Sequence, residues 1–384
     1  MAKKVAAKKA VLKAEATRGA EDVARVDRPV SLDAVIGQKR AVDILRGALA
    51  GERVHHAWIF TGPPGVGKFT AACGFAAELL ADRGANKAQT LELLRTGSHP
   101  DLHVIVKEMA EQSRNASVRS SKQTAIAKDV IDEFMSEPAA RSRVVESDSA
   151  AGKVFIVDEA ELIRHDSQNA VLKLLEEPPL GTVIILVTTD EHRLLPTVRS
   201  RCQRVAFFPL EATALQAWLT TSGLTLEGPE RDWLLAYAGG APGQIVSARK
   251  AGLFSWHTKL DRMLTALGAG QGEGTSGLGA AMAALVEERA KAVQEENEKA
   301  SKETANRVWC KRMLSFVAER LRRQMIGAAR GGQADRAAAM AAALDAVSAA
   351  ERQLDSNVRY DGVLDNLVAQ IASGRAGLSL MPAR

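Results

Sequence analysis

A group of glycines early in the chain has the spacing of a loop that binds phosphate. Residues 60–70 read FTGPPGVGKFT, which contains the pattern Gly-x4-Gly-Lys between an apolar stretch and a helix-compatible one. The glycines let successive backbone N–H groups point toward one anion, and Lys68 can reach its outer phosphates. The predicted contacts to a nucleotide in this loop are Gly62, Pro63, Pro64, Gly65, Val66, Gly67, Lys68 and Thr70.

The residue after the loop lysine departs from this pattern. It is expected to be Ser or Thr, whose hydroxyl binds Mg²⁺, but here it is Phe69. Thr70 lies about 100° further around the helix, so it cannot take over the metal position, although it can touch an inner phosphate. We therefore expect a site for ATP or ADP with impaired Mg²⁺ coordination, which holds a nucleotide better than it uses one.

Two adjacent carboxylates, Asp158 and Glu159, end an apolar stretch that begins at Lys153. Such a stretch reads as a strand buried in a parallel sheet, and ligands bind at the carboxyl edge of such sheets. Asp158 can hold Mg²⁺ directly or through water, and Glu159 can polarise an attacking water. The alternative, that the pair only caps the next helix, is weakened by the phosphate-binding loop upstream.

Alternating stretches of strand and helix character position these side chains. Strands are predicted at residues 56–61, 102–106, 153–160, 182–188 and 205–208, and helices at 39–50, at 71–94 with a break at Gly84, at 126–135 and at 167–177. This alternation predicts a parallel sheet covered by helices. Residues 108–122 are polar and rich in Ser, which predicts an exposed loop or insert. His99 and His103 lack a third metal ligand, so we interpret them as ordinary loop and strand residues.

Shifts in composition divide the chain into six segments. They are a basic flexible arm at 1–26, an α/β domain at 27–209, a small helical domain at 210–267, a Gly-rich linker at 268–279, a second helical domain at 280–374 and a tail at 375–384. The basic arm is interpreted as a solvated tail in preference to a nucleic-acid contact. Residues 351–371 carry apolar side chains, Val358 among them, at a spacing that suits one helical face.

The length, composition and charge of the chain exclude several classes of protein. The chain has 384 residues, of which 46% are hydrophobic, and no stretch approaches the ~20 apolar residues that a membrane span needs. Cys73, Cys202 and Cys310 are too few for a disulfide framework, and residues 1–18 lack the apolar centre of an export signal, so we expect a reducing, cytoplasmic location. The formal charge of +5 suits a protein that works near an anionic polymer.

Further motifs follow one another along the chain. They are VIGQ at 35–38, HAWIF at 56–60, VDEAE at 157–161, QNAVLK at 168–173, EEPP at 176–179, LPTVRSRC at 195–202 and LDSNV at 354–358. In this order they make the chain similar to the bacterial clamp-loader branch of the AAA+ ATPases, over roughly residues 33–371. Several motifs in the correct order are much harder to match by accident than one.

The resemblance implies a fold, an assembly and roles for residues. Each subunit would have a RecA-like nucleotide-binding domain, a helical lid domain and a helical collar domain, and would join a hetero-pentamer that loads the sliding clamp of DNA polymerase III onto primed DNA near the nucleoid. ATP would lie between neighbours, and Arg201 matches the arginine finger that reaches the nucleotide of the next subunit. Thr189 is the candidate sensor after the fourth apolar strand. Gln244 stands where catalytic members have a nucleotide-sensing arginine, and the cysteine-rich zinc module of those members is missing, so no zinc is expected.

Two hypotheses follow from the matches and departures. In the first, the chain has weak or no ATPase activity of its own and lends Arg201 to a neighbouring ATPase. In the second, the chain is an active clamp-loader ATPase that uses Lys68, Asp158 and Glu159. A weaker third option is a DNA-binding module that acts through Lys173 and the basic arm. For Arg201 alone, the simplest alternative is a surface arginine at a strand edge.

Overall fold

The computed structural model describes residues 28–51, 53–81, 87–120, 125–144, 149–268, 275–296, 302–356 and 358–374. The predicted arm at 1–26, the tail at 375–384 and residues 269–274 of the linker lie outside these ranges. The chain divides into two compact units, one with Met1–Leu226 and Ala238–Ile245, the other with Glu227–Tyr237 and Val246–Arg384. The predicted small helical domain at 210–267 therefore contributes to both units, and its bounds stay a prediction.

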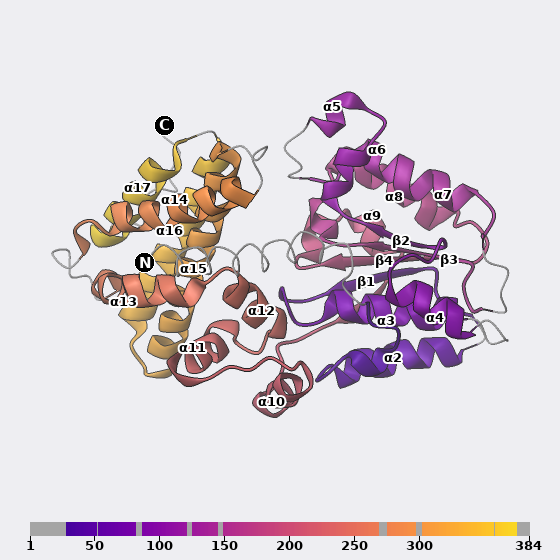
Figure 1. Cartoon of the computed structure of the whole chain (residues 1–384), viewed down its shortest axis with the longest axis horizontal. Helices are drawn as coiled ribbons and strands as arrows, with labels where there is room; N and C mark the ends of the chain where they lie inside the picture. The colour runs from indigo at the N-terminus through magenta and orange to yellow at the C-terminus, as the bar shows by residue number, and fades with distance from the viewer. Residues whose placement is uncertain are drawn as a thin grey trace, which may run out of the picture. The chain divides into compact units, whose positions relative to one another are not determined.

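The first unit is built on a five-stranded sheet in which every pair of neighbouring strands is parallel. Its strands are β1 (Ala57–Thr61), β2 (Leu102–Ile105), β3 (Lys153–Val157), β4 (Thr182–Thr188) and β5 (Gln203–Ala206), in the spatial order β2-β3-β4-β1-β5. All residues of β1, β3 and β4 are buried, which explains why these stretches are continuously apolar and do not alternate. The predicted parallel α/β fold is confirmed (Figure 1).

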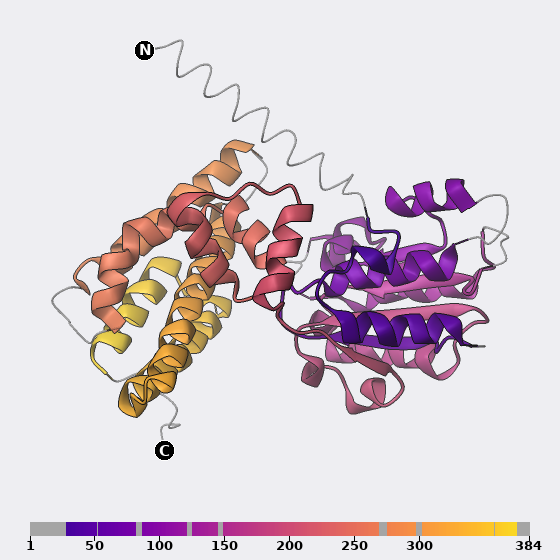
Figure 2. The same ribbon diagram turned by 90° about the horizontal axis from the view of Figure 1, so that it is seen from below.

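Helices cover both faces of this sheet. The helices of the unit are α2 (Lys39–Ala50), α3 (Lys68–Leu80), α4 (Lys87–Arg95), α5 (Ala116–Arg119), α6 (Lys128–Ile131), α7 (Glu137–Ala140), α8 (His165–Glu176), α9 (Pro196–Arg199) and α10 (Ala212–Thr221). Short 3₁₀ turns lie at Leu32–Ala34, Lys107–Gln112, Ala160–Leu162 and Glu191–Arg193, and a π turn at Asp132–Ser136. Trp58 and Phe60 pack with α2 and α3, whereas Ala57 and Ile59 pack with α6 and α8, as the two-residue period of a strand requires. Figures 1 and 2 show these helical layers along the sheet.

The predicted exposed loop or insert at 108–122 is correct in exposure for most of its described residues, but it is not an irregular loop. Residues 107–112 form a 3₁₀ turn and residues 116–119 form α5, and Ala110, Ser113 and Val118 are buried. Glu133 holds the segment, because its carboxylate accepts hydrogen bonds from Ser113 Oγ (2.9 Å) and Arg114 N (2.8 Å). A distant partner therefore orders a stretch whose own composition is that of a loop.

Two predicted helix bounds are also wrong. The helix predicted at 126–135 spans 128–140 instead, because α6, the π turn and α7 follow one another with helical backbone at each junction. The π turn lies just before Pro138, whose nitrogen has no N–H to donate to the preceding turn. The stretch 351–371 is interrupted between α16, which ends at Asp355, and α17, which begins at Tyr360. Val358 falls in this break and is 43% exposed, so it does not belong to the apolar face.

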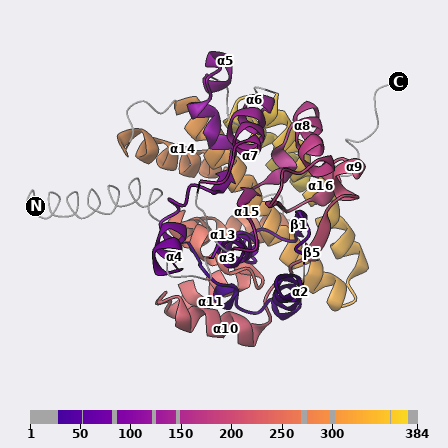
Figure 3. The same ribbon diagram turned by 90° about the vertical axis from the view of Figure 1, so that its right-hand side faces the viewer.

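The second unit consists of helices. Its elements are α11 (Gly228–Ala238), α12 (Pro242–Lys250), α13 (Leu253–Gly268), α14 (Leu278–Glu296), α15 (Lys302–Arg330), α16 (Ala334–Asp355) and α17 (Tyr360–Ala372), of which α11 and α12 lie partly in the first unit. The helices α14 to α17 pack on one another, α15 running along α16 (Figures 1 and 3). Residues 287–303 are rich in charged side chains, and within them Glu287 pairs with Lys302 (3.0 Å). Residues 297–301 of this stretch lie outside the described ranges. None of the described helices is long and apolar enough to cross a membrane.

A buried histidine, His99, and a half-buried one, His103, lie at the β2 edge of the sheet. His99 is 4% exposed, and His103 stacks on Phe155 with ring centroids 4.7 Å apart. Within the described residues, the Nε2 atoms of both are buried without a hydrogen-bond partner, and no three His, Cys, Asp or Glu side chains are grouped to hold a metal. Burial lowers the pKa of both histidines; Asp101 opposes this effect at each, and Lys153 adds to it at His103.

These histidines should make the first unit less stable in acid. Their folded pKa lies below the unfolded value of about 6.5, so the unfolded chain binds more protons once the pH falls below that value. The free energy of unfolding in urea should therefore fall between pH 7.5 and pH 5.5, by at most about 1.4 kcal/mol per pH unit for each histidine. His103→Gln should reduce this slope, and a slope equal to that of the unmodified chain would contradict the assignment.

Candidate functional site

The phosphate-binding loop joins the end of β1 to the start of α3. Gly62, Gly65 and Gly67 have φ values of 146°, 78° and 99°, which residues with a side chain rarely adopt. A Cβ on Gly62 would lie 2.2 Å from the carbonyl oxygen of Phe207. Gln38 supports the loop, because its buried amide donates to the carbonyls of Val66 (3.1 Å) and Phe208 (2.6 Å). The loop is thus shaped by contacts with distant segments as well as by its glycines.

Lys68 points back into this loop. Its Nζ donates to the carbonyls of Gly62 (2.6 Å) and Pro63 (2.7 Å), the oxygens that phosphate oxygens would replace. Burial lowers the pKa of Lys68 to about 8, against the opposing effects of Glu161 and Asp158. The ammonium group is therefore largely protonated at neutral pH and can pair with an anion.

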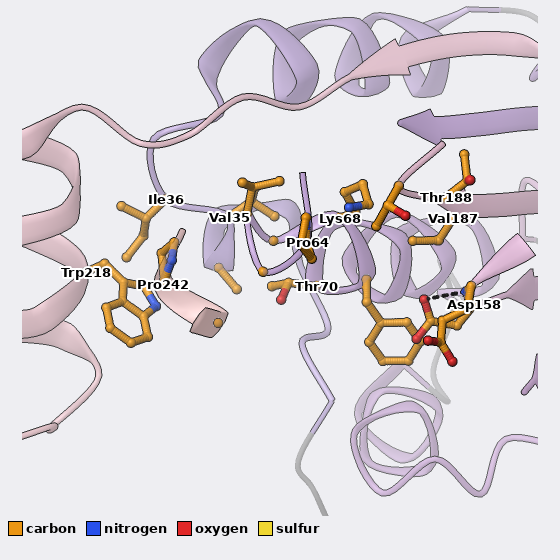
Figure 4. A pocket seen from close by; sticks show the side chains of 18 of the residues that line it. Val35, Ile36, Pro64, Lys68, Thr70, Asp158, Val187, Thr188, Trp218 and Pro242 are labelled. Atoms are coloured by element: carbon orange, nitrogen blue, oxygen red, sulfur yellow. Dashed lines mark hydrogen bonds between the residues drawn. The ribbon is translucent and has the colours of Figure 1, made fainter. Parts of the chain in front are cut away.

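A cavity of about 560 Å³ lies along the loop (Figure 4). Of the predicted site residues, it is lined by Pro64, Gly65, Val66, Gly67, Lys68, Thr70, Asp158, Glu159 and Thr189. Gly62 and Pro63 do not line it, but their carbonyls hold Lys68. Val35, Ile36, Trp218 and Pro242 lie toward one end of the cavity, and Asp158 and Thr188 lie toward the other with Val187 beside them. The first end is apolar and the second is mixed but carries the carboxylate, an arrangement that suits a ligand with an apolar part and a polar part. Trp218 and Pro242 were not predicted, because nothing local marks them as site residues.

The two carboxylates after β3 lie in different environments. Burial raises the pKa of Asp158, and its Oδ1 accepts a hydrogen bond from Glu159 N (3.0 Å). Glu159 has a φ of 50° and is the one described non-glycine residue with a positive φ. Its Oε2 lies 2.5 Å from Lys107 Nζ. The carboxylate that could polarise a water is therefore already paired with a cation, a partner that the sequence did not indicate.

The predicted sensor, Thr189, is also engaged in hydrogen bonds with a carboxylate. Thr189 Oγ1 donates to Glu161 Oε1 (2.5 Å), and Thr189 N donates to Glu161 Oε2 (3.3 Å). Glu161 lines the cavity as well and was part of a recognised motif, although it was not predicted as a site residue. A hydroxyl that donates to a carboxylate has its proton engaged, so Thr189 would have to leave Glu161 to donate to a phosphate.

The start of α12 packs directly on the phosphate-binding loop. Gly243 N donates to the carbonyl of Gly65 (2.8 Å), and a Cβ on Gly243 would lie 2.8 Å from Gly65 Cα. Pro242 and Gly243 line the cavity, whereas the next residue, Gln244, is not among its lining residues. The loop and α12 meet through backbone atoms.

Phe69 lines the cavity, and its ring packs partly against the core between α3 and the sheet. It offers no oxygen to a metal. Asp158 is the predicted residue that could hold Mg²⁺ here, directly or through water, with no hydroxyl partner at position 69. The residues present therefore fit a nucleotide better than a nucleotide with its full magnesium coordination.

Nucleotide binding should for this reason depend little on magnesium. In a titration with fluorescent ADP, we expect dissociation constants within about threefold of each other in Mg²⁺ and in EDTA. Phe69→Thr restores the hydroxyl, and Mg²⁺ should then tighten binding by about tenfold. Thr70→Val, at the next position, serves as the matched control for a hydroxyl that cannot reach the metal. Strong magnesium dependence of the unmodified chain would contradict this prediction.

Arg201 lies away from this cavity. It follows α9 and precedes β5, whose first residue, Gln203, pairs with Trp58 near the start of β1. The phosphate-binding loop follows the opposite end of β1, roughly 13 Å away at the rise of a strand. Arg201 is 38% exposed at its side chain and lines a separate surface cavity that includes His55, His56 and Cys202. The geometry places it at the amino edge of the sheet, while the loop is at the carboxyl edge.

The chain is similar to proteins of known name. The family described as DNA polymerase III, delta subunit, matches residues 37–211. The delta' subunit of DNA polymerase III from Pseudomonas aeruginosa is 33% identical over 202 residues, which cover 50% of this chain and 56% of the relative. The tau subunit from Bacillus subtilis is 32% identical over 196 residues, which cover 50% and 31%. The gamma/tau subunit from Mycobacterium bovis is 29% identical over 253 residues, which cover 63% and 41%. The chain thus spans between about a third and about half of the length of these relatives.

Solved structures show weaker likenesses. The RuvB Holliday junction branch migration motor of Thermotoga maritima matches with a TM-score of 0.37 and 19% identity, covering 61% of this chain and 67% of the other. A gamma subunit-related protein of DNA polymerase III from the same organism matches with a TM-score of 0.36 and 17% identity, covering 87% and 99%. At these scores we draw no functional conclusion from either structure.

Proposed function

Because this chain is a member of the clamp-loader AAA+ family, we propose that it is a delta-prime-like subunit of the replicative clamp loader of DNA polymerase III. It would join gamma/tau-like and delta-like subunits in a hetero-pentamer and help load the sliding clamp onto primed DNA. Arg201 would act on the nucleotide of a neighbouring ATPase, and the chain's own ATP site would be degenerate. We place this work in the cytoplasm, at the nucleoid.

The observation that carries this proposal is the separation of Arg201 from the chain's own phosphate-binding loop. The guanidinium is partly exposed at the amino edge of the sheet, and the loop lies beyond the carboxyl end of β1. A charged side chain that cannot reach its own nucleotide but remains accessible is suited to act on the nucleotide of another subunit.

The chain's own cavity supports the same proposal. Phe69 supplies no ligand to Mg²⁺, Glu159 is paired with Lys107, and Thr189 is bonded to Glu161. In a working ATPase these three positions bind metal, activate water and sense phosphate, respectively. A nucleotide could still occupy the cavity and stabilise the fold, because the loop and Lys68 are intact.

The proposal is tested by measuring ATP hydrolysis by the chain alone and with its partner ATPase subunits. We expect little or no turnover by the isolated chain and rapid, DNA-stimulated turnover by the assembled complex. Rapid hydrolysis by the isolated chain, abolished by Lys68→Ala, would overturn the proposal.

That outcome would favour the second candidate function, a gamma/tau-like ATPase that hydrolyses its own ATP. The observation that supports it is the cavity itself, where Lys68, Asp158 and Glu159 line a space of about 560 Å³. The weaker third option, DNA binding through Lys173 and the basic arm, would be raised by a steep loss of DNA affinity with rising salt for the isolated chain.

A further inference from the structure

The guanidinium of Arg201 is held by two acceptors from neighbouring elements. Its Nη2 lies 2.8 Å from Glu176 Oε1, and its Nη1 donates to the carbonyl of Thr197 (3.0 Å). Glu176 is the last residue of α8, and Thr197 belongs to α9, the short helix just before Arg201. The side chain therefore has a defined direction although it lies at the surface.

The end of α8, which carries Glu176, is itself held in place by packing and by a hydrogen bond. The neighbouring Leu175 is 2% exposed in the core, and the Leu175 carbonyl is hydrogen-bonded by His56 Nε2 (3.0 Å). The end of α8 is thereby tied to the segment that leads into β1. A carboxylate on such a support can restrict the rotamers of a long, flexible arginine.

The contacts leave the guanidinium available to a second anion. An arginine has five N–H donors, and the bonds to Glu176 and Thr197 use one on each terminal nitrogen. Both side chains of the ion pair remain accessible, at 38% for Arg201 and 45% for Glu176. Phosphate oxygens of a neighbour could therefore meet the remaining donors without breaking the contact with Glu176.

We propose that Glu176 is a positioning residue for Arg201: it fixes the direction of the guanidinium before the neighbouring nucleotide arrives. This inference rests on the proposed function, in which Arg201 acts in trans. Because Arg201 stabilises charge that develops during phosphoryl transfer, misdirecting it affects the rate of the step more than the binding of ATP. Glu176 acts only through Arg201 and does not touch the nucleotide.

The test uses the complete clamp loader, reconstituted with Glu176→Gln, Arg201→Ala and the double variant. Glu176→Gln keeps the shape of the side chain and removes its charge, and we expect kcat of the DNA-stimulated ATPase to fall about three- to tenfold with KM for ATP unchanged. In the Arg201→Ala background the same change should have no further effect, which a general loss of structure would not reproduce. Glu177→Gln, at the adjacent carboxylate, is the matched control and should leave kcat unchanged.

The outcomes separate this inference from the function on which it rests. If Arg201→Ala lowers the rate but Glu176→Gln leaves it unchanged or raises it, the positioning role is wrong and the proposed function stands. An equal loss from Glu176→Gln with and without Arg201 also overturns the positioning role. If Arg201→Ala itself has no effect, the proposed function fails, and the positioning role fails with it.

Discussion

Replacement of Arg201 by alanine is expected to lower the ATPase rate of the assembled clamp loader by about 10³- to 10⁵-fold at the site that it serves. A guanidinium is always charged, and its planar N–H donors match phosphate oxygens, so it can neutralise charge on the transferring phosphoryl group. Alanine removes these donors without changing the backbone at the turn between α9 and β5. The measurement is the steady-state DNA-stimulated ATPase of the reconstituted complex.

The same variant should leave the chain's own nucleotide affinity unchanged. Arg201 lies at the amino edge of the sheet, and the cavity with Lys68 lies at the carboxyl edge. Arg204→Ala is a suitable control, because Arg204 is a nearby exposed arginine that pairs with Glu191 (2.7 Å). Loss of the chain's own nucleotide binding in Arg201→Ala, with no loss of ATPase by the complex, would show that Arg201 acts within its own subunit.

Replacement of Gly62 by alanine is expected to destabilise the first unit by about 2–5 kcal/mol and to abolish nucleotide binding. The φ of Gly62 is 146°, and an added Cβ would lie 2.2 Å from the carbonyl oxygen of Phe207. The backbone of Gly62 or that of Phe207 must therefore move. Gly62 also offers its carbonyl to Lys68, so this movement disturbs the lysine. Urea denaturation and a titration with fluorescent ADP measure the two effects.

Gly67→Ala separates the backbone conformation from the steric contact. Gly67 also has a positive φ, 99°, but an added Cβ there would meet no atom within 4 Å. We expect a smaller loss, about 1–2 kcal/mol, since only the unfavourable φ remains. If the two variants lose equal free energy of unfolding, the steric contact with Phe207 does not contribute to the effect of Gly62→Ala.

The amino-acid sequence by itself determined the parts of this protein that depend on local pattern. The glycine spacing located the phosphate-binding loop, and the continuous apolar stretches of β1, β3 and β4 located strands, because central parallel strands are buried on both faces. Phe69 could be recognised as a departure without a structure, since the missing hydroxyl is a property of one residue.

Only the tertiary structure decided which partners these residues have. Lys107 and Glu159 are 52 positions apart and Glu161 and Thr189 are 28 apart, yet each pair meets at the carboxyl edge of the sheet. Glu176 meets Arg201 at the amino edge because α8 returns along the sheet from one edge to the other. Trp218 and Ser113 likewise take their places from distant segments. A contact between residues far apart in sequence depends on how the whole domain packs, and no local periodicity reports it.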